Sequence, residues 1–132
     1  MVSKVFSASP VGVGAEIIEV EADVHNGLPA TVVVGLPDTA VQESRERVKS
    51  AIKNSGASYP QTRVSINLAP ADVPKNGSHL DLPIALAVLI ASGGIAVDTQ
   101  KKLFVGELAL DGSLRSVPGI LSIVRLAHAK GY

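Results

Sequence analysis

"PKNGSHLDLPIAL", residues 74–86, joins a polar loop to a long apolar segment. Pro74 and Gly77 favour a loop in its first half. Apolar residues then continue from about Leu82 to Ser92, and Asp81 stands at the start of this run. Such a run without charges predicts a buried helix. The segment therefore predicts a polar loop that leads directly into a core helix.

The same helix is not expected to cross a membrane. Its uncharged run extends from Leu82 to Val97 and is interrupted by Pro83 and by Gly93-Gly94, whereas a spanning helix needs about 20 apolar residues. The N-terminus lacks the apolar core of a signal peptide. The chain also has no cysteine, which fits a reducing compartment. We therefore expect a cytoplasmic protein that makes no membrane contact.

Alternation of apolar and polar residues predicts strands on both sides of a first helix. Residues 15–24, AEIIEVEADV, and 63–69, RVSINLA, alternate with a period of two. Residues 2–8 and the β-branched run 31–34 predict two further strands. The first helix is expected to begin at Asp38 or Thr39 and to end at Gly56. Its apolar face contains Val41, Val48, Ala51 and Ile52.

The C-terminal third is expected to form a hairpin and a last helix. Residues 103–110 and 114–117 read as strands joined by a tight turn at Asp111-Gly112. A helix then follows over residues 120–130. Because the first strands follow one another without helices, the sheet should be largely antiparallel or mixed, with helices over one face. We predict one α/β domain over residues 1–132, a two-layer sandwich.

The loop of residues 74–81 contains serine, histidine, aspartate and lysine, which invites comparison with a catalytic site. A Ser-Lys hydrolase would use Ser78 as nucleophile and Lys75 as base. A simpler interpretation makes Asp81 an acceptor for the amides of the helix N-terminus and His79 an exposed loop residue. We favour the structural interpretation.

Other common site motifs are absent from the sequence. Gly12-Val13-Gly14 lacks the third glycine of a dinucleotide loop, and no G-x-x-x-x-G-K-[ST] loop occurs. The three histidines, His25, His79 and His128, do not have metal-ligand spacing, and each is expected at the surface. The 2 Phe, 2 Tyr and no Trp are too few for a base-stacking platform. We therefore expect no metal or cofactor within these residues.

Basic residues on the first helix are the one candidate contact for nucleic acid. They could bind phosphates weakly. The competing interpretation is a solvated helix face, partly neutralised by Glu43 and Glu46 and without a net positive field. The basic residues are Arg45, Arg47, Lys49 and Lys53.

Three long motifs resemble the N-terminal domain of the magnesium-chelatase-related AAA+ ATPases, the bacterial ComM or YifB-like proteins. They are GLPATVVVGLPDTAVQESRERVKSAIKNSG, INLAPADVPKNGSHLDLPIAL and GELALDGSLRSVPGIL, and the resemblance covers about residues 4–131. It implies the fold shared by the Lon proteolytic domain, GHMP kinases and a small-subunit ribosomal protein. It also implies an AAA+ module C-terminal to this chain that holds ATP and Mg²⁺, in a hexamer that drives branch migration of DNA in natural transformation.

The resemblance to Lon also bears on the loop. Pro74-Lys75-Asn76-Gly77 resembles the Pro-Lys-Asp-Gly segment that precedes the nucleophilic serine of Lon-like peptidases. The serine position then falls on Asp81 and the lysine position on Leu121, so both members of the dyad are replaced. The loop with Lys75, Ser78 and Asp81 would be retained as a scaffold.

The resemblance thus implies a non-catalytic accessory domain. Its expected partners are its own AAA+ module, neighbouring subunits and DNA. Two alternatives stay open, a Ser-Lys peptidase that uses Ser78 and a GHMP-type kinase whose phosphate loop would be residues 75–78.

Overall fold

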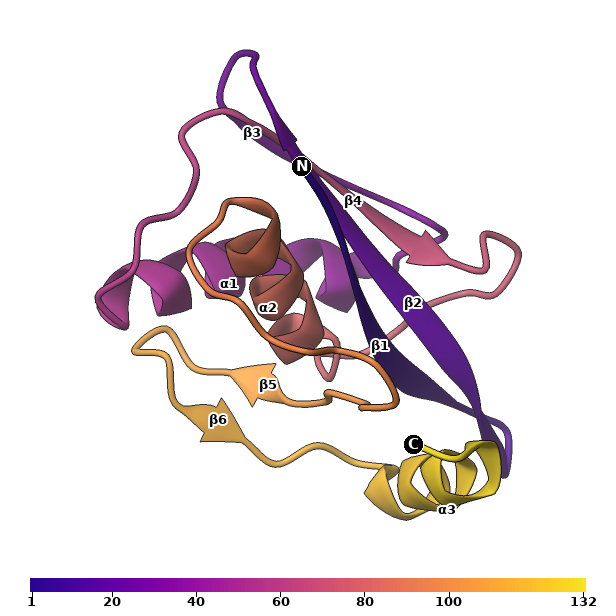
Figure 1. Ribbon diagram of the computed structural model, residues 1–132. Helices are drawn as coiled ribbons and strands as arrows, with labels where there is room; N and C mark the ends of the chain where they lie inside the picture. Colours follow the sequence, from indigo (N-terminus) through magenta and orange to yellow (C-terminus); the bar gives the residue numbers. More distant parts are fainter.

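The computed structural model describes all residues, 1–132. Nine elements follow one another along the chain (Figure 1). They are β1 (Val2–Val11), β2 (Gly14–His25), β3 (Ala30–Val34), α1 (Thr39–Asn54), β4 (Arg63–Ala69), α2 (Asp81–Ala91), β5 (Glu107–Leu108), β6 (Leu114–Arg115) and α3 (Ile120–Lys130).

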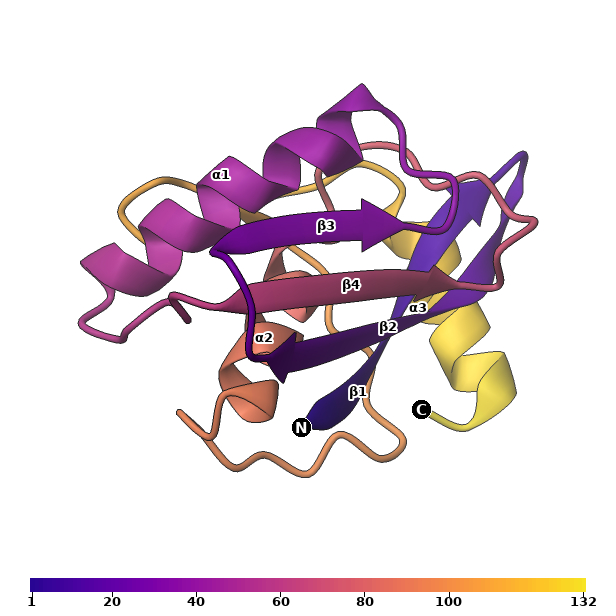
Figure 2. The same ribbon diagram turned by 90° about the horizontal axis from the view of Figure 1, so that it is seen from above.

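Four strands form a mixed sheet in the order β1-β2-β4-β3 (Figure 2). β1 and β2 form a long antiparallel hairpin that turns at Gly12, where φ is +58°. β2 pairs antiparallel with β4, whereas β3 pairs parallel with β4. After β2 the chain leaves a gap of one strand and forms β3 at the edge of the sheet. It then returns through α1, and β4 fills the gap between β2 and β3. The predicted mixed sheet is confirmed.

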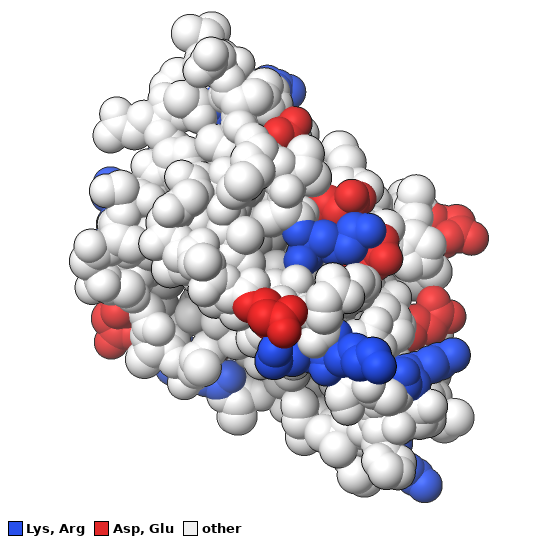
Figure 3. All heavy atoms as spheres, in the orientation of Figure 1, with Lys and Arg blue, Asp and Glu red and all other residues white.

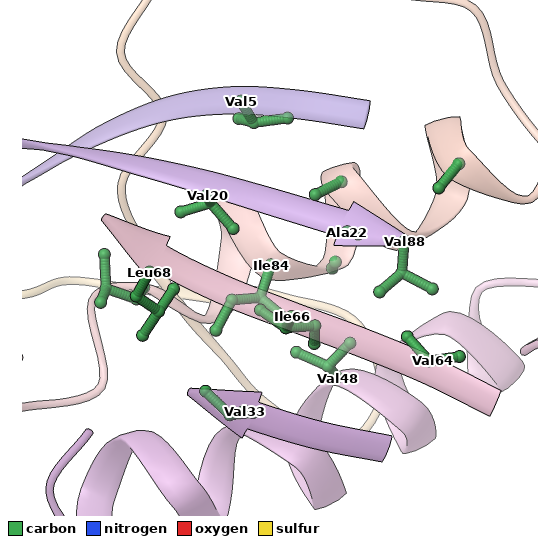
Figure 4. Close-up of a cluster of buried hydrophobic side chains, with 14 of the residues drawn as sticks. Val5, Val20, Ala22, Val33, Val48, Val64, Ile66, Leu68, Ile84 and Val88 are labelled. Carbon is green, nitrogen blue, oxygen red and sulfur yellow. The ribbon is translucent and has the colours of Figure 1, made fainter. Parts of the chain in front are cut away.

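The core lies between one face of this sheet and helices α1 and α2. Val20 of β2, Ile66 of β4 and Val33 of β3 point toward Val48 of α1 and Ile84 of α2 (Figure 4). This arrangement follows from the alternation in the strands, because every second residue faces the helices. The two-layer α/β sandwich is confirmed.

None of the three helices has the length and hydrophobicity needed to cross a membrane.

Helix α3 packs on β1 and β2, close to the tip of their hairpin (Figure 1). Ile123 is its one buried residue, and Ser122 Oγ donates to the carbonyl oxygen of Val13 at 3.5 Å. Ile120, Leu121 and Val124 remain exposed.

The strand predicted over residues 103–110 is only partly formed. β5 contains two residues and pairs with β6 in a separate two-stranded sheet. The backbone before β5 is bonded to several elements instead of one strand: the Phe104 amide donates to Phe6 of β1, and the Gly106 amide donates to the His79 carbonyl. Residues 103–106 therefore cover the edge of β1 and link it to the loop before α2.

The backbone at Gly35, just after β3, lies very close to the backbone of Leu68 in β4. Gly35 has a φ of +109°, and a Cβ atom built there would lie 2.1 Å from the carbonyl oxygen of Leu68 in β4. The position thus requires glycine for two reasons, its backbone conformation and the lack of space. Asp38 then caps α1, accepting the Val41 amide at 2.8 Å.

Candidate functional site

Asp81, the first residue of α2, is fully buried and connects three elements. Its carboxylate accepts hydrogen bonds from Ser44 Oγ of α1 at 2.5 Å and from the Leu108 amide of β5 at 3.1 Å. Arg47 of α1 donates to both carboxylate oxygens, from Nε at 2.7 Å and from Nη2 at 3.1 Å. This two-pronged ion pair is the strongest type of side-chain hydrogen bonding available to a carboxylate.

These contacts correct one prediction: Asp81 does not cap α2, because the N-cap position is Leu80 and no helix amide donates to the carboxylate. Arg47 as a contact for phosphate stays a prediction, and its guanidinium donates to Asp81 and to the Ala40 carbonyl at 2.9 Å. The hydrogen bond to Asp81 raises the pKa of Arg47 above its ordinary value. Both residues therefore stabilise the packing of α1 against α2 and β5.

Ser78 and Lys75 have different partners. Ser78 Oγ donates to the Glu107 carboxylate, whose second oxygen lies 3.8 Å from Arg115 Nε. Lys75 Nζ donates to the Pro70 carbonyl oxygen. The geometry thus gives Ser78 a carboxylate as neighbour and not the amine that a Ser-Lys dyad requires.

Lys75 anchors the loop that precedes α2. Its side chain is fully buried, and burial lowers the pKa of its ammonium group below the ordinary value. Its amide donates to Leu36 and its carbonyl oxygen accepts the Asp38 amide, which ties the loop to the start of α1. The loop is therefore held in place by both backbone and side-chain contacts.

His79 lies in the interior, and its predicted place in an exposed loop is wrong. Only 5% of the residue is exposed, and a hydrogen bond of 2.9 Å joins its Nε2 to Ser9 Oγ of β1. Burial lowers the pKa of the imidazole below its ordinary value, while the charges of Asp81 and Asp38 oppose this shift. His25 and His128 are exposed, as the sequence predicts.

The free energy of unfolding is expected to fall as the pH is lowered from about 6.5 toward 5. The unfolded chain has a His79 pKa near 6.5 and the folded chain a lower one, so in this window the unfolded state binds the additional proton. A single proton limits the slope to about 1.4 kcal/mol per pH unit. Urea denaturation of the wild type and of His79→Gln measures the slope, which the variant should lose.

His128→Gln is the matched control for this prediction, since His128 is exposed on α3. It should keep the wild-type slope. An equal slope in the wild type and in His79→Gln would contradict the assignment.

Leu121, the position matched to the lysine of Lon-like peptidases, lies on the exposed surface of α3. It is 68% exposed on α3, which packs on β1 and β2. Asp81, at the matched serine position, is enclosed by α1 and β5. Neither position carries a hydroxyl or an amine. Leu121 lies on the surface of α3, whereas Asp81 is buried between α1 and β5.

The three remaining basic residues form a row on the exposed side of α1. Arg45, Lys49 and Lys53 are each four residues apart and exposed, so they share one helix face. Arg45 donates to the Thr31 carbonyl of β3 at 3.4 Å. The face drawn in Figure 3 carries basic and acidic side chains side by side, without a broad basic surface.

Ser44, Ser9 and Glu107 are the site residues that the sequence analysis missed. Ser44 had a usable signal, since it lies on the same face of α1 as Val41 and Val48. A hydroxyl on an apolar helix face indicates a buried hydrogen bond. Ser9 and Glu107 carried no such signal, because their partners are 70 and 29 residues away in the chain.

The fold and the site define a two-layer α/β domain in which a buried ion pair joins α1 to α2. A model of the family described as subunit ChlI of Mg-chelatase matches residues 20–132. The chain belongs to this ChlI family, an AAA+ ATPase-like group. The assignment confirms the resemblance seen in the three motifs.

Three relatives illustrate the similarity. The YifB protein of Escherichia coli K12 is 50% identical over 130 residues, 98% of this chain and 26% of the relative. Competence protein ComM of Haemophilus influenzae is 43% identical over 125 residues, 94% of this chain and 25% of the relative. A Lon protease of Finegoldia magna is 26% identical over 126 residues, 90% of this chain and 16% of the relative. The chain thus spans about a quarter of the length of YifB and ComM.

Proposed function

We propose that residues 1–132 form a non-catalytic accessory domain of a cytoplasmic, Mg-chelatase-like AAA+ ATPase. The domain would contribute to assembly with its own AAA+ module and neighbouring subunits, and to contacts with DNA during branch migration in natural transformation. ATP and Mg²⁺ would bind in the AAA+ module, since no phosphate-binding loop of the G-x-x-x-x-G-K-[ST] type occurs in this chain.

The observation that carries the proposal is the environment of Asp81. A buried carboxylate with Ser44, Arg47 and the Leu108 amide as donors has no free lone pair directed toward a substrate. Its contacts join helices and a strand, which is what a scaffold requires. The similarity to ComM supports the assignment to DNA processing, because that relative is named a competence protein.

The alternative of a Ser-Lys peptidase lacks support from the geometry. Ser78 donates to Glu107, and Lys75 is buried against Pro70. A base must lie within hydrogen-bond reach of the hydroxyl from which it takes a proton. Since Lys75 is bonded elsewhere, Ser78 has no activating amine.

We expect no hydrolysis of an unfolded protein such as casein by this chain. The Ser78→Ala variant should give the same background rate, because the hydroxyl has no activating amine. Fluorescence of a dye-labelled casein reports peptide release, and circular dichroism confirms that both proteins are folded. In the full-length protein, the same variant should retain ATP hydrolysis.

Turnover of the casein above background, abolished in Ser78→Ala and retained in a folded Ser58→Ala control, would refute the non-catalytic assignment. Ser58 is an exposed serine outside the loop that precedes α2, so it separates loss of the candidate nucleophile from a general effect of serine removal.

A further inference from the structure

A groove lies between the second half of α1, the start of β3 and the connection of residues 57–62 that leads to β4. Figure 1 shows this connection rising from the end of α1 to the sheet. The groove has a volume of about 550 Å³, and Lys49, Lys53, Tyr59 and Thr62 are among its lining residues. This volume lies within the range of ligand sites for small molecules.

Two cations line the groove without an acidic partner. Lys49 and Lys53 have no carboxylate within 4.0 Å, in contrast to Lys4 and Lys102, which form ion pairs. A rise of 1.5 Å per residue separates the two along α1 by about 6 Å. Only Lys53 lies in the last turn of the helix, where the helix dipole favours a cation. Lys49 lies before the last turn, so the helix dipole does not account for a cation at that position.

Arg45 extends this pair by one further turn. Its guanidinium reaches the carbonyl oxygen of Thr31, at the rim where β3 begins. Glu46, which is exposed to solvent, is close enough to act on the charge of Tyr59. The cationic wall of the groove is therefore formed by Lys49 and Lys53, and Arg45 lies outside the lining, one helical turn further along α1.

The opposite wall supplies polar groups in fixed positions. Tyr59 is half-buried, and its hydroxyl is joined to Thr31 Oγ1 at 2.6 Å. Thr62 Oγ1 is buried and has no hydrogen-bond partner. Ser58 and Gln61 also line the groove. A buried hydroxyl without a partner is rare in a folded protein and is costly unless another group satisfies it.

We propose that this groove binds an organic phosphate of about the size of a mononucleotide. Lys49 and Lys53 would hold the phosphate by charge-assisted hydrogen bonds, and the polar wall around Tyr59 and Thr62 would receive the remainder of the ligand. The phosphate could be that of a free mononucleotide or of one unit in a single-stranded nucleic acid. The nucleic-acid form of this inference rests on the proposed DNA contacts of the domain, whereas binding of a free mononucleotide does not.

Titration of the chain with AMP and with a dT12 oligonucleotide, in 50 mM salt, tests the proposal. Isothermal calorimetry gives the affinities. Amide chemical shifts should change at residues 57–62 and at the end of α1. The affinity of the variant Lys49→Gln/Lys53→Gln should be lower by a factor of about ten or more, because both side chains that bind the phosphate are changed. Added salt should weaken binding further.

The control is Lys4→Gln/Lys130→Gln, which removes the same net charge away from the groove and should keep wild-type affinity. Tighter binding of AMP than of dT12 assigns the free nucleotide as the ligand, and the reverse order assigns the nucleic acid. Two results would overturn the proposal: no binding of either probe at millimolar concentration, or binding that the control variant weakens as much as Lys49→Gln/Lys53→Gln does.

Discussion

The Asp81→Ala variant is expected to lose about 3–5 kcal/mol of unfolding free energy. The substitution removes the partner of Arg47 and leaves the Ser44 hydroxyl and the Leu108 amide without their acceptor. Arg47 is 23% exposed at its side chain, so solvent compensates only part of the loss. Urea denaturation at pH 7, followed by circular dichroism, measures the change.

Asp98→Ala is the matched control for this experiment. Asp98 forms an ion pair with Lys102 at 3.5 Å but is largely exposed. Because solvent screens such a pair, its removal should change the free energy of unfolding far less than Asp81→Ala does. The double variant Arg47→Met/Asp81→Leu should be more stable than Asp81→Ala, because it leaves no buried charge unpaired. A loss below about 1 kcal/mol for Asp81→Ala would show that the ion pair does not hold α1 against α2.

The Gly35→Ala variant is expected to destabilise the domain by more than about 2 kcal/mol. An alanine must adopt a φ of +109°, and its Cβ would meet the Leu68 carbonyl oxygen at 2.1 Å. Left-handed backbone alone costs an L-residue about 1–2 kcal/mol, and the steric overlap adds to this. Since Leu68 belongs to the central strand β4, relief requires β3 and β4 to separate. The midpoint of thermal unfolding reports the effect.

Gly56→Ala separates the two contributions. Gly56 also has a positive φ, +86°, but no atom lies within 4 Å of the added Cβ. It should therefore show only the conformational cost, about 1–2 kcal/mol. If both variants lost the same stability, the close approach to Leu68 would not be the cause.

The sheet and the three helices were predictable because their signals are local. The alternation in residues 15–24 and 63–69 specifies one buried face for β2 and β4. Turn residues and caps mark where α1 and α3 begin and end. The strand predicted over 103–110 failed for the opposite reason: its amides bond to Phe6 and to His79, which are distant in sequence. No local pattern encodes that choice of partners.

The candidate site was predictable in its residue types and not in its contacts. The sequence marks Lys75, Ser78 and Asp81 as polar residues beside a core helix, but Asp81 and Arg47 lie 34 residues apart. An amphipathic pattern places Arg47 on a polar helix face, and it does not show that α2 brings a carboxylate to that face. His79 was assigned to the surface for the same reason, since Ser9 becomes its neighbour only when β1 has docked.

The two margins of the sheet limit pairing with another chain in different ways. β1 is shielded along part of its length, because Phe104 occupies its backbone acceptor at Phe6 and Thr99 bonds to the Lys4 carbonyl. β3 is the other margin. Arg45 bonds to its Thr31 carbonyl, and the strand is only 5 residues long and lies between Pro29 and Pro37. Short strands bracketed by prolines are poor templates for intermolecular β-pairing. We therefore expect neither edge of the sheet to pair readily with a strand of another chain.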